Sequence, residues 1–398
     1  MKSNTIEMAR STQEQTSGEI INVGHLSDYL KRLTDTRKRR GIRYALDVLL
    51  TLFILAKLCG QNKASGIADW VQLRGEDFRA ALNLKHQKLP HHSTYRRVFS
   101  EVVNEDELEK IVAEYLSQLP RSGQAVVIAI DGKTVRGTIT PEDPFGLHLL
   151  AAYLPGEGIV LMQMVVEKDK ENEIVVAPKL LNCLDLRNAV VVGDAMQTQR
   201  ELSIQIVAAG GSFVWIVKDN QPKTREAIEF LFTPQPNIPG VGNPPMDFQS
   251  ATTTEKQAGR IEERTITVSS MLNDYLDWPH LAQVFKLERR FTHLASGKVE
   301  AETQYGLTNL LPKDASPQRL LAIVRSEWGI ESGLHYRRDV TYEEDKTRMT
   351  KKSMARVMAI INNLVISLLN RQGFDNHAHA RRVFDASTDK GLALICGL

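Results

Sequence analysis

The stretch "AVVIAIDG" occupies residues 125–132, and "NAVVVGDA", at residues 188–195, shows the same pattern. Each stretch is an unbroken apolar run that leads to an aspartate. A short apolar run without alternation is typical of a strand that is buried on both faces. The two stretches therefore predict neighbouring strands of an α/β sheet, with Asp131 and Asp194 at the carboxyl ends of those strands.

The segments around these two strands complete the sheet. "LHLLAAYL" (147–154) and "IVLMQMVVE" (159–167) flank the turn "PGEG" and predict an antiparallel hairpin that extends the first strand. Helical patterns follow at 172–184 and 199–210, and "SFVWIVK" (212–218) predicts another buried strand. The expected order is three strands, helix, strand, helix, strand, which indicates an α/β layer over residues 121–220.

The regions on either side of this layer have different sequence patterns. Residues 1–20 are polar and predicted to be disordered, and residues 21–120 carry helical patterns that indicate a helical domain. Period-two strands at 259–270, 283–293 and 298–310 predict a β-rich insertion over residues 221–316. Helices resume at Pro317 and continue to the end at residue 398, and they include a long apolar helix over 353–373.

Composition limits the classes of protein. The 50 Lys and Arg residues nearly balance the 48 Asp and Glu residues, so net charge neither requires nor excludes a polyanionic partner. Three widely spaced cysteines indicate neither a disulfide framework nor a thiolate metal site. The N-terminus has no apolar signal region, and the apolar run at 48–59 is too short to cross a bilayer. We expect a cytoplasmic protein that does not use a membrane.

The two strand-end aspartates suggest a metal site. An isolated buried carboxylate is costly, and two on adjacent strands repel each other unless a cation lies between them. Hard carboxylate ligands without a Cys or His cluster point to Mg²⁺ or Mn²⁺, and a pair of such ions suits phosphodiester chemistry. Each aspartate could instead simply cap the segment that follows it, because Asp is common at helix caps and turns.

A third carboxylate is expected near the C-terminus. The stretch from Glu327 to Asp345 contains six acids, and the helix entered at Pro317 has two apolar stripes that pass through Glu327 and Glu331. We expect Trp328 to lie on the first of these core-facing stripes. Asp339 and the triplet "EED" are predicted to lie beyond the helix. Periodicity cannot choose between Glu327 and Glu331, which are four residues apart on one face.

Five motifs together suggest a family. "AIDGKTVRGT", "KENEIVVAPKLL", "VVGDAMQTQREL", "VKDNQP" and "WGIESGLHYRRDVTYEEDKTRM" resemble, in order and spacing, the motifs of DDE transposases from bacterial insertion sequences. The branch that includes the H-repeat-associated proteins is the most similar. The resemblance covers roughly residues 25 to 372 of this chain.

The resemblance implies an RNase H-like catalytic core interrupted by a β-rich insertion, with an all-α N-terminal domain that recognises DNA. It implies catalytic and metal-binding roles for Asp131, Asp194 and Glu331, with Mg²⁺ or Mn²⁺ as two bound ions. The implied activity is cleavage at transposon ends and transfer of the 3′-hydroxyl into target DNA by a homodimer on paired ends. Glu327, Ser332 and Tyr336 stand where the family usually has His, Asn and Trp. Two alternatives are a nuclease of the same fold without strand transfer and an inactive DNA-binding derivative.

Basic residues suggest where double-stranded DNA binds. Clustered cations suit phosphate contacts, although such runs are often only solvated surface. Arg96 and Arg97 are expected in the first turn of a helix capped by Ser93 or Thr94, and the cations near the acids are either phosphate contacts or neutralising partners of the acidic cluster. The candidates are Arg37, Lys38, Arg39, Arg40, Arg43, Arg96, Arg97, Lys133, Arg136, Lys218, Arg337, Arg338, Lys346 and Arg348.

Overall fold

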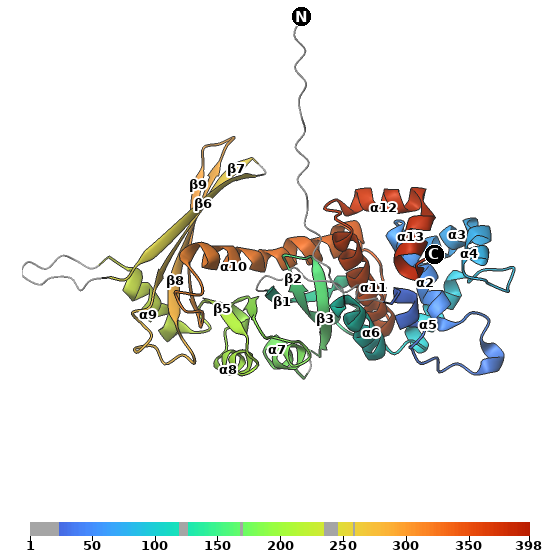
Figure 1. Ribbon diagram of the computed structural model, residues 1–398, viewed down its shortest axis with the longest axis horizontal. Coiled ribbons are helices and arrows are strands. Elements are labelled where there is room, and N and C mark those ends of the chain that lie inside the picture. Colours follow the sequence, from blue (N-terminus) through green and yellow to red (C-terminus); the bar gives the residue numbers. More distant parts are fainter. Residues whose placement is uncertain (1–23, 119–125, 168–169, 235–245, 258) are drawn as a thin grey trace, which may run out of the picture.

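The computed structural model describes residues 24–118, 126–167, 170–234, 246–257 and 259–398 (Figure 1). The expected disordered tail at residues 1–20 and residues 235–245 of the predicted β-rich insertion lie outside these residues.

The predicted α/β order is confirmed. The strands are β1 (Val126–Val135), β2 (Leu147–Leu154), β3 (Ile159–Val166), β4 (Ala189–Gly193) and β5 (Ser212–Val217), and the helices between the last three are α7 (Glu173–Leu181) and α8 (Arg200–Ala208). Their order in the sheet is β3-β2-β1-β4-β5. β1, β4 and β5 run parallel, while β2 and β3 form the expected antiparallel hairpin beside β1.

The strands of the predicted insertion extend the same sheet. β6 (Gln249–Gln257), β7 (Arg260–Ser269), β8 (Gln283–His293) and β9 (Val299–Thr308) follow α9 (Pro222–Phe232). β9 pairs antiparallel with β5, so all the strands join in one nine-stranded sheet. β7, β8 and β9 match the predicted strands. β6 was not predicted, because most of its side chains are polar and exposed and it therefore shows no apolar alternation.

Helices from the two ends of the sequence pack together at one end of the molecule (Figure 1). The N-terminal helices are α1 (Leu26–Leu30), α2 (Leu46–Leu58), α3 (Ala64–Leu73), α4 (Gly75–Ala81), α5 (His92–Glu101) and α6 (Glu105–Ser117). The C-terminal helices are α11 (Lys352–Arg371), α12 (His377–Ala386) and α13 (Thr388–Cys396). α2 contacts all three C-terminal helices, which explains why its sequence is apolar all round.

α11 has the length and hydropathy of a membrane span, but 83% of its apolar window is buried inside the protein. We therefore interpret it as a core helix. It packs against α2, α5, α6 and β3 and so joins the helical end to the sheet.

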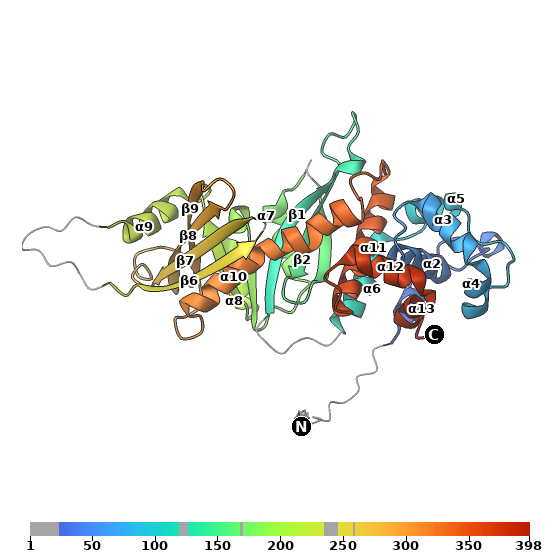
Figure 2. The ribbon, with the colours of Figure 1, turned by 90° about the horizontal axis from the view of Figure 1, so that it is seen from above.

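The helix α10 (Pro317–Ile330) crosses the sheet and contacts β1, β4, β6 and β7 (Figures 1 and 2). Ser316 caps its N-terminus, and Pro317 occupies the first turn, where its missing N–H is not needed. The helix was expected to end before Asp339. Instead the chain continues in two π-helical turns, Glu331–His335 and Arg337–Thr341. Such turns are uncommon and are frequently found at functional sites.

Buried polar contacts attach the helical end to the edge strand β3. The backbone N–H of Gln163 donates to Glu109 Oε1 at 3.0 Å, and Asn363 Nδ2 donates to Gln163 Oε1 at 2.8 Å. Ser367 Oγ accepts a bond from the N–H of Val160 at 3.0 Å. These contacts satisfy backbone groups that an edge strand would otherwise expose.

The buried carboxyl of Glu109 makes stability depend on pH. Burial raises its pKa to about 7, against an ordinary value of 4.5, and the bond from Gln163 only partly opposes this shift. Because the pKa is higher in the folded state, the free energy of unfolding should fall as pH rises from 4.5 to about 7. The loss should be on the order of 3 kcal/mol.

Glu109→Gln keeps an oxygen for the Gln163 N–H and cannot titrate, so its unfolding free energy should lack this component of the pH dependence. Denaturant unfolding across the pH window measures the difference. An equal slope in wild type and variant would contradict the assignment.

Candidate functional site

Asp131 and Asp194 lie side by side at the junction of β1 and β4. The parallel register pairs Ile130 with Gly193, and the two aspartates are the next residues on each strand. Asp194 follows the end of β4 as predicted. Asp131 does not end its strand, because β1 continues to Val135 through antiparallel pairing with β2.

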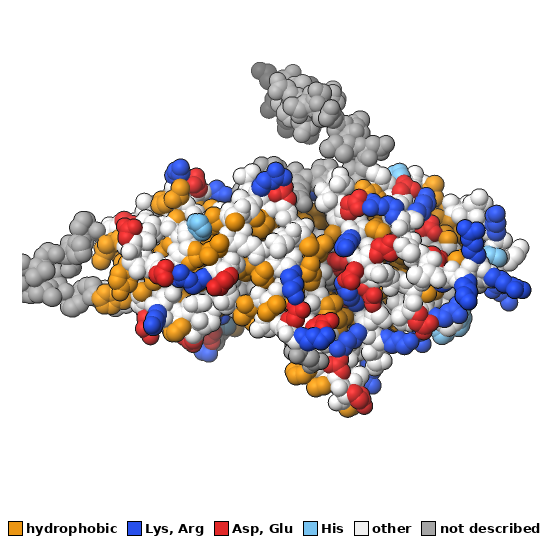
Figure 3. All heavy atoms as spheres, turned by 90° about the horizontal axis from the view of Figure 1, so that it is seen from below, with side chains coloured by type: hydrophobic (Ala, Val, Ile, Leu, Met, Phe, Trp, Pro, Cys, Tyr) orange, Lys and Arg blue, Asp and Glu red, His pale blue; other side chains and the backbone are white. Residues whose placement is uncertain are grey.

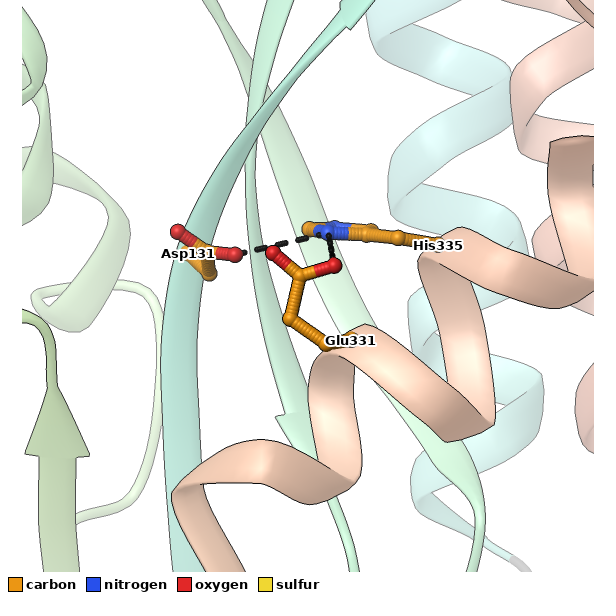
Figure 4. Close-up of side chains that lie close together, drawn as sticks. All are labelled: Asp131, Glu331 and His335. Carbon is orange, nitrogen blue, oxygen red and sulfur yellow. Dashed lines mark ion pairs between the residues drawn. The ribbon is translucent and has the colours of Figure 1, made fainter. Parts of the chain in front are cut away.

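Glu331 and His335 approach Asp131 from the first π-helical turn (Figure 4). His335 Nδ1 lies 3.4 Å from Asp131 Oδ2 and 3.7 Å from Glu331 Oε2. One ligand atom from each residue can be chosen so that all three lie within 4.8 Å of one another. The group could therefore hold a metal ion. His335 was missed, although its spacing four residues after Glu331 was a usable signal.

His335 stands where a positive charge is favoured. Burial opposes protonation of its ring, but hydrogen bonds to Asp131 and Glu331 outweigh burial and raise the pKa of His335. In turn, the hydrogen bond from His335 lowers the pKa of Glu331. Glu331 remains accessible, with 66% of its side chain exposed, while His335 is buried. The carboxylates thus favour a cation, and a protonated imidazole supplies part of that charge.

Glu327 belongs to the same site. It lies one turn before Glu331 on α10, and burial together with repulsion from Asp194 and Asp131 raises its pKa to about 8. Burial and the charges of Asp131 and Glu173 likewise raise the pKa of Asp194. Repulsion among these acids is therefore not fully relieved by the residues around them.

The apolar stripes of α10 were partly mispredicted. Trp328, assigned to a core-facing stripe, is 57% exposed, and the guanidinium of Arg289 lies 4.6 Å from the centre of its ring. By contrast, Trp278, which lies between β7 and β8, is buried in the core.

A second layer of polar residues supports the aspartates. His148 Nε2 lies 2.8 Å from Glu173 Oε1, and Gln197 Nε2 donates to Glu173 Oε2 at 3.2 Å. This layer explains the glycine after Asp131, because a Cβ on Gly132 would lie only 2.1 Å from Glu173 Oε1. Glu173 could not be singled out from the sequence beyond its place in a motif.

The acids after Glu331 have separate partners. Lys133 Nζ, which is buried, donates to Asp339 Oδ2 at 2.6 Å. The backbone N–H of Arg136 donates to Asp345 Oδ1 at 2.9 Å, and the side chain of Arg136 is exposed. Lys133, Arg136, Glu331, His335 and Asp339 line one pocket of about 490 Å³ beside the catalytic candidates.

Two arginines of the last motif are structural. Arg338 is fully buried, and its guanidinium lies 2.7 Å from Glu344 Oε2. Asn362 Nδ2 donates to the other oxygen of Glu344 at 2.9 Å. Arg337 contacts Asn370 and His377. Arg338 has no exposed surface and therefore cannot contact a phosphate of DNA. It neutralises the carboxylate of Glu344 instead.

The remaining basic candidates lie mainly at the helical end, where Figure 3 shows Lys and Arg side chains gathered on the surface. Arg37 is held by Asp35 at 2.6 Å. Arg96 and Arg97 are exposed on α5, but the cap of this helix is His91 rather than Ser93 or Thr94, so they lie beyond the first turn. The other candidates with exposed side chains are Lys38, Arg39, Arg40, Arg43, Lys218, Lys346 and Arg348.

Comparison with known proteins identifies the family. A family described as "Transposase DDE domain" matches residues 122–368, and one described as "DDE_Tnp_1-associated" matches residues 27–116. "Putative transposase YncI" of Escherichia coli O157:H7 is 28% identical over 88% of both chains. "H repeat-associated putative transposase YhhI" and "Putative protein YbfL", both of Escherichia coli K12, are 25% and 26% identical over 92% of this chain and 95% of theirs.

These matches bear out the resemblance drawn from the motifs, including the branch of H-repeat-associated proteins. The chain belongs to the family of transposases with a DDE domain.

Proposed function

We propose that this chain is a metal-dependent transposase that cleaves DNA at transposon ends and joins the freed 3′-hydroxyl to target DNA. The observation that supports the proposal is that Asp131 has Asp194 beside it on the neighbouring parallel strand and Glu331 near it after α10, although Glu331 is far from both aspartates in sequence. The order β3-β2-β1-β4-β5 supports an RNase H-like core.

The domain roles follow from this core. Residues 121–220 and 317–398 form the core in two parts, and residues 221–316 are its insertion. Residues 21–120 form the helical DNA-binding domain. Cutting two ends together would engage a homodimer on paired ends, so that each subunit acts at one end.

Asp131, Asp194 and Glu331 would hold Mg²⁺ or Mn²⁺, as two ions. Their carboxylate oxygens are the ligands that such hard cations prefer, and the raised pKa values of Asp194 and Glu327 indicate negative charge that the surrounding residues leave uncompensated. When bound, the ions would activate the attacking oxygen and stabilise the leaving oxygen at phosphorus.

The chain's own residues would position the DNA and hold protons. Water would attack the phosphorus at the transposon end and break its bond to O3′, which leaves a 5′-phosphate and, after the leaving oxygen takes up a proton, a 3′-hydroxyl. That hydroxyl would then attack a target phosphorus, lose its proton and break the bond from this phosphorus to the target strand's own O3′, which leaves as a second 3′-hydroxyl. His335 would hold the carboxylates of Asp131 and Glu331 in place. Arg136 and Lys218 are exposed and would hold phosphates.

Substitution of each of the three acids tests their role in catalysis. Asp131→Asn, Asp194→Asn and Glu331→Gln should each reduce Mg²⁺-dependent cleavage by more than about a hundredfold, because even the supporting partners of metal ligands cost 10–100-fold. DNA binding should persist. The assay is nicking and strand transfer on a supercoiled plasmid that carries the gene with its flanking DNA, with exposed Glu201→Gln as the matched control.

The same assay tests the choice of third acid. If Glu331→Gln still cuts DNA and Glu327→Gln does not, Glu327 is the catalytic acid instead. Cleavage by the wild type without any joined product would favour a nuclease of the same fold. Binding without any metal-dependent cutting would favour an inactive derivative.

Metal binding at Asp194 can be tested without an activity assay. Asp194→Asn keeps the oxygen that accepts the N–H groups of Met196 and Gln197 and removes a charge that burial and Asp131 disfavour. The variant should unfold at a higher temperature than wild type in chelator. Adding Mn²⁺ at a hundred times its Kd should stabilise the wild type by about 2.7 kcal/mol and the variant by much less. An equal response of both proteins would contradict a metal site at Asp194.

A further inference from the structure

A basic groove of about 940 Å³ lies between α5 and the segment 346–351, which begins with the last four residues of the fifth motif. Its cations come from three separate parts of the sequence: Lys63 before α3, Arg96 and Arg97 on α5, and Lys346, Arg348 and Lys351. Glu101 is the one acid among the residues that line it. Only Arg96, Arg97, Lys346 and Arg348 were anticipated from the sequence, and as two unrelated sets.

Most of these cations are free to bind a ligand. Within the residues that the structure describes, the side chains of Lys63, Arg96, Arg97 and Arg348 form no hydrogen bond or ion pair, and Lys351 is 64% exposed beside Glu101 at 3.4 Å. Ser65, Thr94 and Thr350, which carry hydroxyl groups, also line the groove. Cations and hydroxyls spread along a groove match the repeated phosphates of a nucleic acid backbone better than a single anion.

The groove and the catalytic pocket are connected through backbone segments that pack on each other. A Cβ on Gly137 would lie 2.5 Å from the carbonyl oxygen of Thr347, so the segment after β1 packs directly on the segment that forms the groove wall. Arg136, which lines the catalytic pocket, bonds through its backbone to Asp345 on this same segment. A polyanion in the groove would therefore continue past Arg136 to Glu331.

We propose that this groove binds the duplex DNA that adjoins the scissile phosphate, so that α5 and the segment 346–351 hold one double helix between them. The proposal rests on the proposed function for its choice of DNA as the ligand. It adds Lys63 and Lys351 to the DNA contacts and joins the N-terminal helices and the last catalytic motif into one binding surface. Binding of the transposon end and placement of its scissile phosphate would then depend on the same contacts.

The experiment measures binding without cleavage. A labelled duplex of arbitrary sequence is titrated in chelator at several salt concentrations, because backbone binding is sequence-independent and its salt slope counts the phosphates contacted. The paired variants Lys63→Gln with Lys351→Gln, and Arg96→Gln with Arg348→Gln, should each weaken binding and reduce the slope by about 2, or about 1 per cation removed.

The matched control is Lys313→Gln with Lys390→Gln, which removes two exposed lysines outside the groove. Near-ultraviolet circular dichroism and thermal unfolding establish that all variants are folded. The proposal is overturned if the groove variants keep the slope of the control.

The groove assignment and the proposed function can fail separately. If the groove variants bind more weakly but the wild type never cleaves DNA with metal, the proposed function fails and the groove assignment stands. If the groove variants bind normally while the wild type cleaves DNA with metal, the groove assignment fails and the proposed function stands.

Discussion

The repulsion between Asp131 and Asp194 is the constraint on which the site depends. Parallel pairing of β1 and β4 fixes the two carboxylates beside each other, and burial increases the free-energy cost of their repulsion. α10 then brings Glu327 and Glu331 to the same place. In the absence of a cation, the environment of this cluster raises the pKa values of both Glu327 and His335, which shifts each group toward its protonated form.

The surrounding structure serves to hold these acids in register. Glu173 and His148 lie directly over Gly132 and leave no room for a side chain there, and Gln197 donates a hydrogen bond to Glu173. The π-helical turns let α10 change its path so that Glu331 and His335 both face Asp131. The buried pair of Arg338 with Glu344 then attaches the second π-helical turn to α11 through Asn362. Such pairs are weak evidence for stability, but they specify one arrangement of the segment.

The sequence predicted the parts of this architecture that burial dictates. Apolar runs located β1, β4 and β5, and the apolar run at 48–59, judged too short to cross a bilayer, forms most of the buried helix α2. Periodicity narrowed the third acid to Glu327 and Glu331, both of which lie at the site. It could not show that β1 continues beyond Asp131, because that extension depends on pairing with β2. It also could not show that Trp328 is exposed and contacts Arg289, a residue far from it in sequence. The groove could not be predicted from local patterns, because its cations meet only when both ends of the chain pack together.

Joint binding of the catalytic metal by Asp131, Asp194 and Glu331 can be tested by anomalous diffraction from Mn²⁺ in crystals of the wild-type chain with DNA. Each anomalous peak locates an ion and so identifies its ligands without reference to activity. We expect peaks within bonding distance of both aspartates and of Glu331. Ions bound by Asp194 and Glu327 without Glu331, or found only away from the aspartates, would contradict this assignment.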